Sequence, residues 1–170
     1  MDRPDDSVTG VVNSTPLIAL SIVGHLGLLR DLFDQVFIPA SVYKEVVRRG
    51  RGRPGARDVA QADWLVVREP KETIPLPAEL MGLDQGEIDV ILLAKEIGAD
   101  WVLIDEKLAR QVARAVGLRV KGTLGVLLVT HRIGLLSRKE ALEAVWELAQ
   151  SSVRLSDKLV RWFEEQVGSA

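Results

Sequence analysis

The chain has 170 residues, of which 47% are hydrophobic and 27% charged, and it contains no cysteine. This composition is typical of one globular domain and excludes disordered, collagen-like and coiled-coil chains, disulfide frameworks, thiolate zinc sites and thiol nucleophiles. Any metal site must therefore use oxygen or histidine ligands. With 22 basic against 24 acidic residues the formal charge is -2, so no global positive field indicates nucleic-acid binding.

The stretch from Ser7 to Leu29 has no formal charge and is long enough to span a bilayer. Polar residues interrupt it, and the acidic start of the chain is unlike a secretory signal. We therefore expect no membrane association and a cytoplasmic protein. Val8 to Val12 predicts a strand, Ser14 and Thr15 are expected to cap the helix that follows, and glycines 24 and 27 divide the next segment into two short helices.

Residues 36–38 predict a second strand, and Ser41 is expected to cap a helix that carries Glu45. Residues 48–55 are rich in arginine and glycine and predict a mobile basic loop. A third strand is expected at 64–67, followed by a proline-marked connector over residues 70–77.

The clearest helix begins around Asp84 and ends at Gly98. An apolar strand over 101–104, a basic helix that ends at Gly117, and a short strand over 119–121 follow it. Helices are expected at 124–133, 138–149 and 157–167. Because apolar strands alternate with helices, we predict a single α/β domain over residues 1–170, a three-layer α/β/α sandwich with a mainly parallel central sheet.

Polar residues directly follow three of the predicted strands: Asn13 and Ser14, Asp105 and Glu106, Gly122 and Thr123. Ligands of such sheets bind beyond the carboxyl ends of the strands. Asp84 and Glu87 share one face at a helix start. Bringing Glu45, Glu87 and Asp105 into one cleft would be costly without a bound cation, and oxygen ligands favour Mg²⁺ or Mn²⁺. Such an ion can activate water against a phosphodiester, which is nuclease chemistry.

The order of these elements resembles the PIN-domain family of metal-dependent ribonucleases. The resemblance covers about Val11 to Leu136, and the helices over 137–168 lie outside this motif-bearing region. It rests on five segments, at residues 12–18, 39–46, 83–87, 103–110 and 122–125.

The resemblance implies a Mg²⁺- or Mn²⁺-dependent endoribonuclease with RNA as its substrate. It implies a metal-ligand set of Asn13, Glu45, Glu87 and Asp105, the last three being catalytic, with Asp84 and Glu106 as secondary ligands. Where the family norm is aspartate this chain has Asn13, an uncharged ligand that should weaken metal binding. The chain also resembles the toxin halves of toxin–antitoxin pairs, which implies a small antitoxin protein as partner and a homodimer.

Other interpretations stay open. The acids are also explained as residues that stabilise helix N-termini. Ser14, Thr123, Arg110 and Arg51 are candidate substrate-binding residues, although two of them also fit as helix caps, Arg51 as part of a solvated loop, and Arg110 as the partner of a site carboxylate. Trp146, Trp162 and Phe163 are expected to pack against the core or a second subunit rather than to stack on bases.

Two other functions compete with the nuclease. One is a catalytically weak or inactive PIN-like module that binds nucleic acid or protein, which Asn13 favours. The other is a nucleotide-binding or phosphoryl-accepting domain, which no glycine-rich phosphate loop supports. Neither histidine has a partner motif that would indicate a serine nucleophile.

Overall fold

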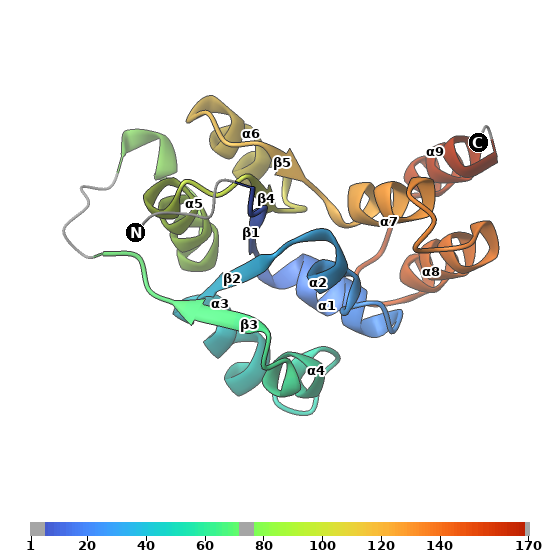
Figure 1. The fold of residues 1–170 in the computed structure, drawn as a ribbon, viewed down its shortest axis with the longest axis horizontal. Coiled ribbons are helices and arrows are strands. Elements are labelled where there is room, and N and C mark those ends of the chain that lie inside the picture. The colour runs from blue at the N-terminus through green and yellow to red at the C-terminus, as the bar shows by residue number, and fades with distance from the viewer. Residues whose placement is uncertain (1–5, 72–76, 169–170) are drawn as a thin grey trace.

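The computed structural model describes residues 6–71 and 77–168, and the fold is an α/β sandwich around a five-stranded parallel sheet (Figure 1). The strand order is β3-β2-β1-β4-β5. The strands are β1 (Thr9–Val12), β2 (Gln35–Pro39), β3 (Leu65–Arg68), β4 (Trp101–Leu103) and β5 (Val120–Lys121). The α/β fold class and the parallel sheet predicted from the sequence are confirmed.

The helices of the first half are α1 (Ser14–Ile22), α2 (Leu28–Leu32), α3 (Ala40–Tyr43), the π-helical turn η1 (Lys44–Arg49), α4 (Ala56–Gln61) and the 3-10 turn η2 (Ala78–Leu80). Those of the second half are α5 (Gln85–Ile97), α6 (Lys107–Ala115), α7 (Thr123–Arg132), α8 (Arg138–Gln150) and α9 (Asp157–Gly168). Most predicted elements are therefore present within a few residues of their expected bounds.

The connections move outward from β1 in two directions. From β1 the chain passes to β2 and β3, and then crosses to β4 and β5 on the other side of β1. Because parallel crossovers are right-handed, helices α1 to α4 and helices α5 and α6 cover opposite faces of the sheet. The order reverses between β1 and β4, so the carboxyl ends of these two neighbouring strands form the crevice where ligands of open α/β sheets bind.

The strands at the centre of the sheet are apolar on both faces, as a doubly covered sheet requires. Val11, Val12, Leu103 and Ile104 are fully buried. Strand β1 pairs with β4 in a register that sets Val12 opposite Leu103, and the amide of Asn13 continues the ladder by donating to the Leu103 carbonyl at 3.0 Å. The two segments that leave the sheet here are thereby held side by side.

Several local predictions were wrong. The N-cap of α1 is Asn13, without a side-chain capping bond, so Ser14 and Thr15 are not caps. Ser41 lies inside α3, and its hydroxyl donates to Asp89 instead. The basic loop predicted over residues 48–55 is shorter in the structure, because η1 extends to Arg49 and α4 begins at Ala56. Residues 72–76 of the predicted connector lie outside the described residues.

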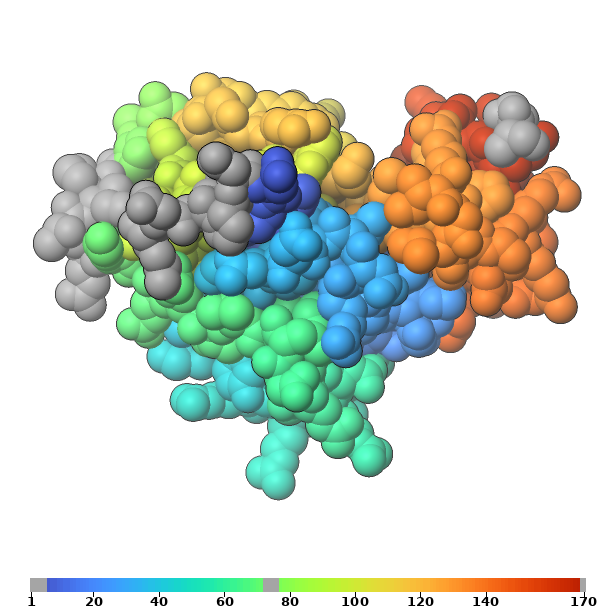
Figure 2. All heavy atoms as spheres, viewed as in Figure 1, coloured from blue at the N-terminus to red at the C-terminus, as the bar shows by residue number. Residues whose placement is uncertain are grey.

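The last three helices form a layer of their own beside the sheet (Figures 1 and 2). Helix α8 begins with a capping box between Ser137 and Glu140, and α7, α8 and α9 pack on one another through a core that includes Leu148 and Phe163, both fully buried. The packing predicted for Phe163 is confirmed. Across the described part of the chain, no helix combines the length and the apolar content needed to cross a bilayer.

Candidate functional site

Asn13 occupies the end of β1 with its side chain buried, at 2% exposure. Its Nδ2 group donates to Glu106 Oε2 at 3.3 Å, whereas its Oδ1 atom is buried and has no hydrogen-bond partner. A buried polar oxygen without a partner costs free energy, and such groups in native structures usually indicate a missing ligand, water or ion. The Asn13 side chain is therefore held by its Nδ2 group, while its Oδ1 atom is an acceptor without a hydrogen-bond partner.

Glu106 follows β4 and joins the two strand ends. Its Oε1 atom accepts a 2.6 Å hydrogen bond from the hydroxyl of Thr15, and its Oε2 atom accepts from Asn13. Both donors belong to the corner that leaves β1, so the carboxylate of Glu106 is oriented by the strand next to its own. The sequence singled out Glu106 only as a secondary ligand and Thr15 only as a helix cap.

Glu87 is fixed at the start of α5 by a reciprocal capping box. The Asp84 amide donates to Glu87 Oε2 at 3.0 Å, and the Glu87 amide donates to Asp84 Oδ1 at 2.9 Å. Burial raises the pKa of Glu87, and the charges of Asp84, Glu106 and Glu45 raise it further. The spacing of three residues therefore places both carboxylates at one helix N-terminus, where the helix dipole favours their charge.

Glu45 reaches the same region from η1. Burial raises the pKa of its carboxyl, as do the charges of Asp84 and Glu106, while a hydrogen bond from the Ser14 side chain opposes the shift. A Cβ atom added at Gly86 would lie 3.5 Å from Glu45 Oε2 and 3.5 Å from Asp84 Oδ1, so the first turn of α5 closely approaches Glu45. Glu45, Asp84, Glu87 and Glu106 thus form one mutually repelling group, which we call the acidic cluster.

Asp105 faces the beginning of α7. Its Oδ1 atom accepts from the Thr123 amide at 2.8 Å and its Oδ2 atom from the Thr123 hydroxyl at 2.6 Å. A Cβ atom at Gly122 would lie only 2.8 Å from Asp105 Oδ1, so the bare backbone of glycine makes this approach possible. Burial raises the pKa of Asp105, the bonds from Thr123 lower it, and Glu106 and Arg110 exert smaller opposite effects.

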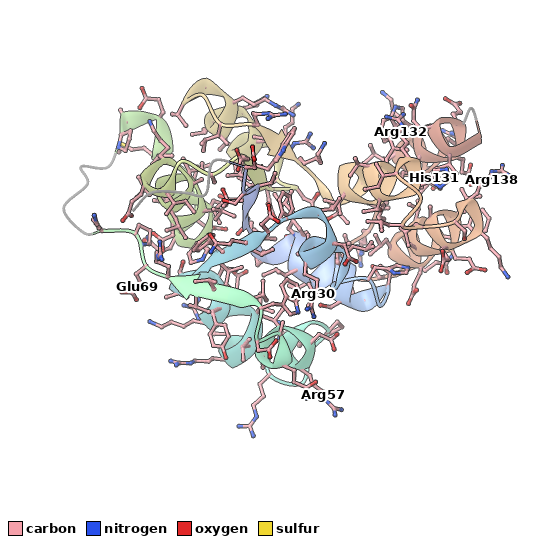
Figure 3. All side chains as sticks on the ribbon, viewed as in Figure 1. Arg30, Arg57, Glu69, His131, Arg132 and Arg138 are labelled. Carbon is pink, nitrogen blue, oxygen red and sulfur yellow. The ribbon has the colours of Figure 1, made fainter. Side chains whose placement is uncertain are left out.

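The predicted site residues are therefore partly brought together. Ser14 and Thr123 contact acids of the region, and Arg110 lies within electrostatic range of Asp105. Arg51 does not join them, because it lines a separate hollow with Arg48 and Arg57, and Figure 3 shows Arg57 directed away from the body of the protein. His131 lies among the C-terminal helices, where its Nδ1 atom is 3.1 Å from the Leu136 carbonyl (Figure 3).

Two observations bear on a metal ion. Over the described ranges, 6–71 and 77–168, no group of three histidine, cysteine, aspartate or glutamate side chains is arranged to hold one. The donor set nevertheless suits a hard cation, because it consists of oxygens alone, its carboxylates repel one another, and Asn13 Oδ1 is a buried acceptor without a partner. The chemistry of these residues is therefore compatible with binding of a divalent cation.

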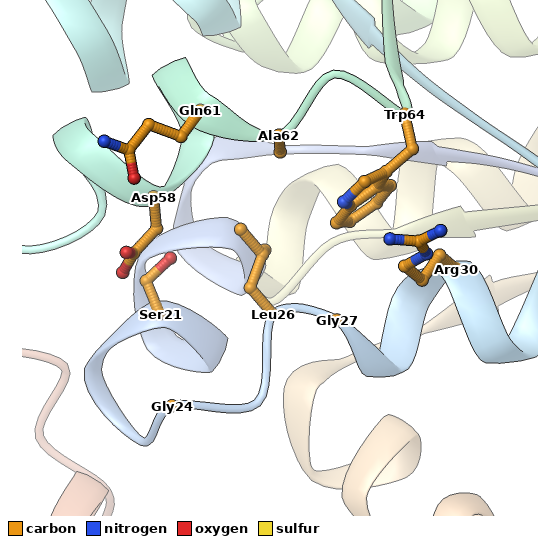
Figure 4. A pocket seen from close by; sticks show the side chains of 9 residues that line it. All are labelled: Ser21, Gly24, Leu26, Gly27, Arg30, Asp58, Gln61, Ala62 and Trp64. Atoms are coloured by element: carbon orange, nitrogen blue, oxygen red, sulfur yellow. The ribbon is translucent and has the colours of Figure 1, made fainter.

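A second hollow lies elsewhere on the molecule, between α1, α2 and α4 (Figure 4). It has a volume of about 300 Å³. Arg30 lies over the ring of Trp64 at its rim, and Asp58 and Gln61 line the opposite side. None of the acidic-cluster residues lines it. This hollow is thus separate from the crevice between β1 and β4.

Acidification should stabilise the metal-free protein through the acidic cluster. The pKa values of Glu45 and Glu87 are raised above the ordinary value of 4.5, so the folded chain takes up these protons at a higher pH than the unfolded chain. Stability should therefore grow as the pH falls through the folded pKa values, and the gain should be complete below about 4.5. Since glutamine mimics the protonated acid, the variant Glu45→Gln/Glu87→Gln should melt at a higher temperature than the wild type at pH 7.

The measurement is thermal melting in EDTA from pH 7 to pH 5. The difference in melting temperature between this variant and the wild type should shrink as the pH falls. Glu147→Gln, at an exposed position of α8, is the control and should show no such trend. A difference that stays constant with pH, or grows toward acid pH, would contradict the repulsion inferred for the cluster.

Comparisons with known proteins agree on the fold. A family model described as a PIN domain matches residues 9–169. Among solved structures, the chain is similar to a PilT N-terminus domain protein from the hyperthermophilic archaeon Sulfolobus solfataricus, with 18% identity and a TM-score of 0.56, over 72% of this chain and 93% of that chain. At this identity the likeness concerns the fold alone. The search of curated proteins gave no significant match.

Proposed function

The chain belongs to the PIN-domain family, generally a nuclease fold, and on this basis we propose that it is a Mg²⁺- or Mn²⁺-dependent endoribonuclease. The observation that carries the proposal is the acidic cluster at the carboxyl ends of β1 and β4, next to the unpartnered Oδ1 atom of Asn13. Mutual repulsion of this kind is unfavourable for a protein that never binds a cation there. Acids held close together at a cost in stability are typical of a functional site.

The residues that would hold the ion are Asn13, Glu45, Glu87 and Glu106, with Asp105 beside them. A bound divalent cation would supply Lewis-acid chemistry, polarising the phosphodiester and lowering the pKa of a water molecule. Asn13 and Thr15 orient the Glu106 carboxylate, and the Asp84 amide orients that of Glu87.

The test is cleavage of a labelled single-stranded RNA by the purified chain in Mg²⁺ or Mn²⁺, with an EDTA control. Glu87→Gln removes one charge of the cluster and retains an oxygen that can accept from the Asp84 amide. We expect it to lower the cleavage rate by about 100-fold or more, since each lost metal ligand removes several kcal/mol of charge stabilisation. Glu147→Gln should cleave as the wild type does, which controls for contaminating ribonuclease.

A second candidate is a PIN-like module that binds without cutting. It is favoured by Asn13, which supplies no charge, and by the lack of an arranged three-residue metal group among the residues described. Folded protein that shows neither metal-dependent cleavage nor metal binding by calorimetry would favour this module over the nuclease.

The resemblance to toxin ribonucleases extends the proposal to the partners. We propose that the chain acts as the toxin-like half of a pair, as a homodimer, and that a small antitoxin inserts a basic side chain into the acidic cluster. Expression of the chain should then arrest growth of a bacterial host, and expression of Glu87→Gln should not. Equal growth with both forms would contradict the toxin role.

A further inference from the structure

A groove of about 590 Å³ extends from the candidate site toward the C-terminal helices. Thr15 and Asp105 line its end at the site, and β5 and the first turn of α7 line its length. Leu159 and Trp162 of α9 line the far wall. In Figure 2 the surface is hollowed between the amber region of α6 and β5 and the orange-red region of α8 and α9. The groove therefore joins Asp105 and Thr15, whose hydroxyl donates to Glu106, to a part of the chain that carries none of the family motifs.

The charge of the groove is opposite to that of the acidic cluster. Of the described residues that line it, four are cationic and Asp105 is the one carboxylate, at the end next to the site. The cations are Arg110, Lys121, Arg154 and Lys158. The ammonium of Lys121 lies 4.3 Å from the centroid of the Trp101 ring, and burial together with the neighbouring charge of Arg119 lowers its pKa. On a chain with a formal charge of -2 this is a local positive surface.

Arg154 is held toward the groove by an unusual backbone. Its φ angle is 48°, which makes it the one non-glycine residue with positive φ in the described part of the chain. The turn that holds it is closed by bonds to Ser151, from the Arg154 amide at 3.3 Å and from the Val153 amide to the hydroxyl at 3.1 Å. A left-handed conformation is costly for arginine, and strained residues of this kind cluster at active sites and ligand-binding sites.

The walls of the groove offer apolar surface rather than further polar groups. Trp162, one helical turn after Lys158, is 41% exposed, and Leu159, which directly follows Lys158, is 44% exposed. Trp162 is thus not buried in the core of its own chain, and its packing against a second subunit stays a prediction. Exposed aromatic rings beside cations are the surface on which single-stranded nucleic acids stack their bases while the cations contact phosphates.

We propose that this groove binds single-stranded RNA and guides it past Asp105 toward the acidic cluster, with Arg154 and Lys158 contacting phosphates and Trp162 stacking on a base. This inference rests on the proposed ribonuclease function. A cluster of four acids repels a polyanion, so the binding energy must come from cations close by, and the groove brings cations to Asp105 at its end next to the site. It also gives the C-terminal helices α8 and α9 a role as one wall of the substrate path.

The test separates binding from cleavage. Affinity of the full chain for a fluorescent single-stranded RNA of about 12 nucleotides is measured by anisotropy in EDTA, so that no metal-dependent cutting occurs. Arg154→Gln/Lys158→Gln should weaken binding and lower the slope of log affinity against log salt by about 1.4, or 0.7 for each lost phosphate contact. Arg161→Gln, on α9 but outside the groove lining, is the matched control and should retain wild-type affinity and slope.

The aromatic contact is tested separately. Trp162→Leu should weaken binding by about fivefold or more and abolish RNA-induced quenching of tryptophan fluorescence, whereas Trp162→Phe should keep most of the affinity. Melting temperatures close to the wild type confirm that each variant is folded.

The results of these experiments distinguish the groove proposal from the proposed nuclease function. Wild-type affinity in all groove variants would overturn the groove, and RNA cleavage by the same proteins would then leave the nuclease function standing. A wild-type chain that binds an acidic peptide but no RNA would overturn the groove as an RNA path, and the cleavage assay would decide the function independently.

Discussion

Glu106→Gln is expected to lower metal-dependent RNA cleavage by about 100-fold or more, as much as a change at Glu87. Glu106 is the carboxylate whose two oxygens are held by Asn13 and Thr15, and its charge acts on both Glu45 and Glu87. Glutamine preserves the size of the side chain and one acceptor oxygen while removing the charge. Single-turnover cleavage rates at saturating Mg²⁺ would measure the loss.

Asp105→Asn is the informative comparison, because the sequence predicts Asp105 rather than Glu106 as a principal ligand. Both carboxylate oxygens of Asp105 accept from Thr123, just as both of Glu106 accept from Asn13 and Thr15. Glu106, but not Asp105, is among the charges that raise the pKa values of Glu45 and Glu87. We expect Asp105→Asn to lower the free energy of unfolding by about 1 to 2 kcal/mol, through loss of one buried hydrogen bond, and to reduce cleavage less than Glu106→Gln does. If Asp105→Asn loses cleavage and Glu106→Gln keeps it, Asp105 rather than Glu106 is the principal ligand.

Asn13→Asp is expected to destabilise the metal-free protein and to make its stability depend strongly on divalent cations. The new carboxylate would be buried beside Glu106, with repulsion in place of the present amide hydrogen bond. An uncompensated buried charge costs about 3 kcal/mol or more, so the melting temperature in EDTA should fall by many degrees. Millimolar Mg²⁺ or Mn²⁺ should restore much of the loss, because binding to the folded state stabilises it.

Asn13→Ala is the control for this substitution, since it removes the same hydrogen bond and adds no charge. It should be destabilised by about 1 kcal/mol and should recover little with metal. If Asn13→Asp melts like the wild type in EDTA and does not respond to metal, the Oδ1 atom of Asn13 does not face a cation site. If Asn13→Asp also cleaves RNA faster than the wild type, the asparagine is what limits metal binding in this chain.

Part of the candidate site can be predicted from the sequence alone. Hydrophobic periodicity and strand-end polarity predict that Asn13, the Asp105–Glu106 pair and Thr123 lie at the carboxyl edge of a parallel sheet, because strands buried on both faces have a recognisable apolar pattern. The capping box of Asp84 and Glu87 is equally local, since residues three apart share one turn of helix. Helix α4 was missed because arginine and glycine next to it signal a loop, and helix packing overrides that propensity.

By itself the sequence therefore determined the fold class, the order of most elements and the acids available for chemistry, since these follow from periodicity and neighbouring residues. Tertiary structure alone decided which of two consecutive acids turns toward which partner. Asp105 faces Thr123 and Glu106 faces Asn13 and Thr15, because adjacent side chains leaving a strand point in different directions and meet different neighbouring elements. It also decided that α9 comes beside β5 and α7 to form a groove, since contacts between residues so distant in the chain depend on packing that no local pattern encodes.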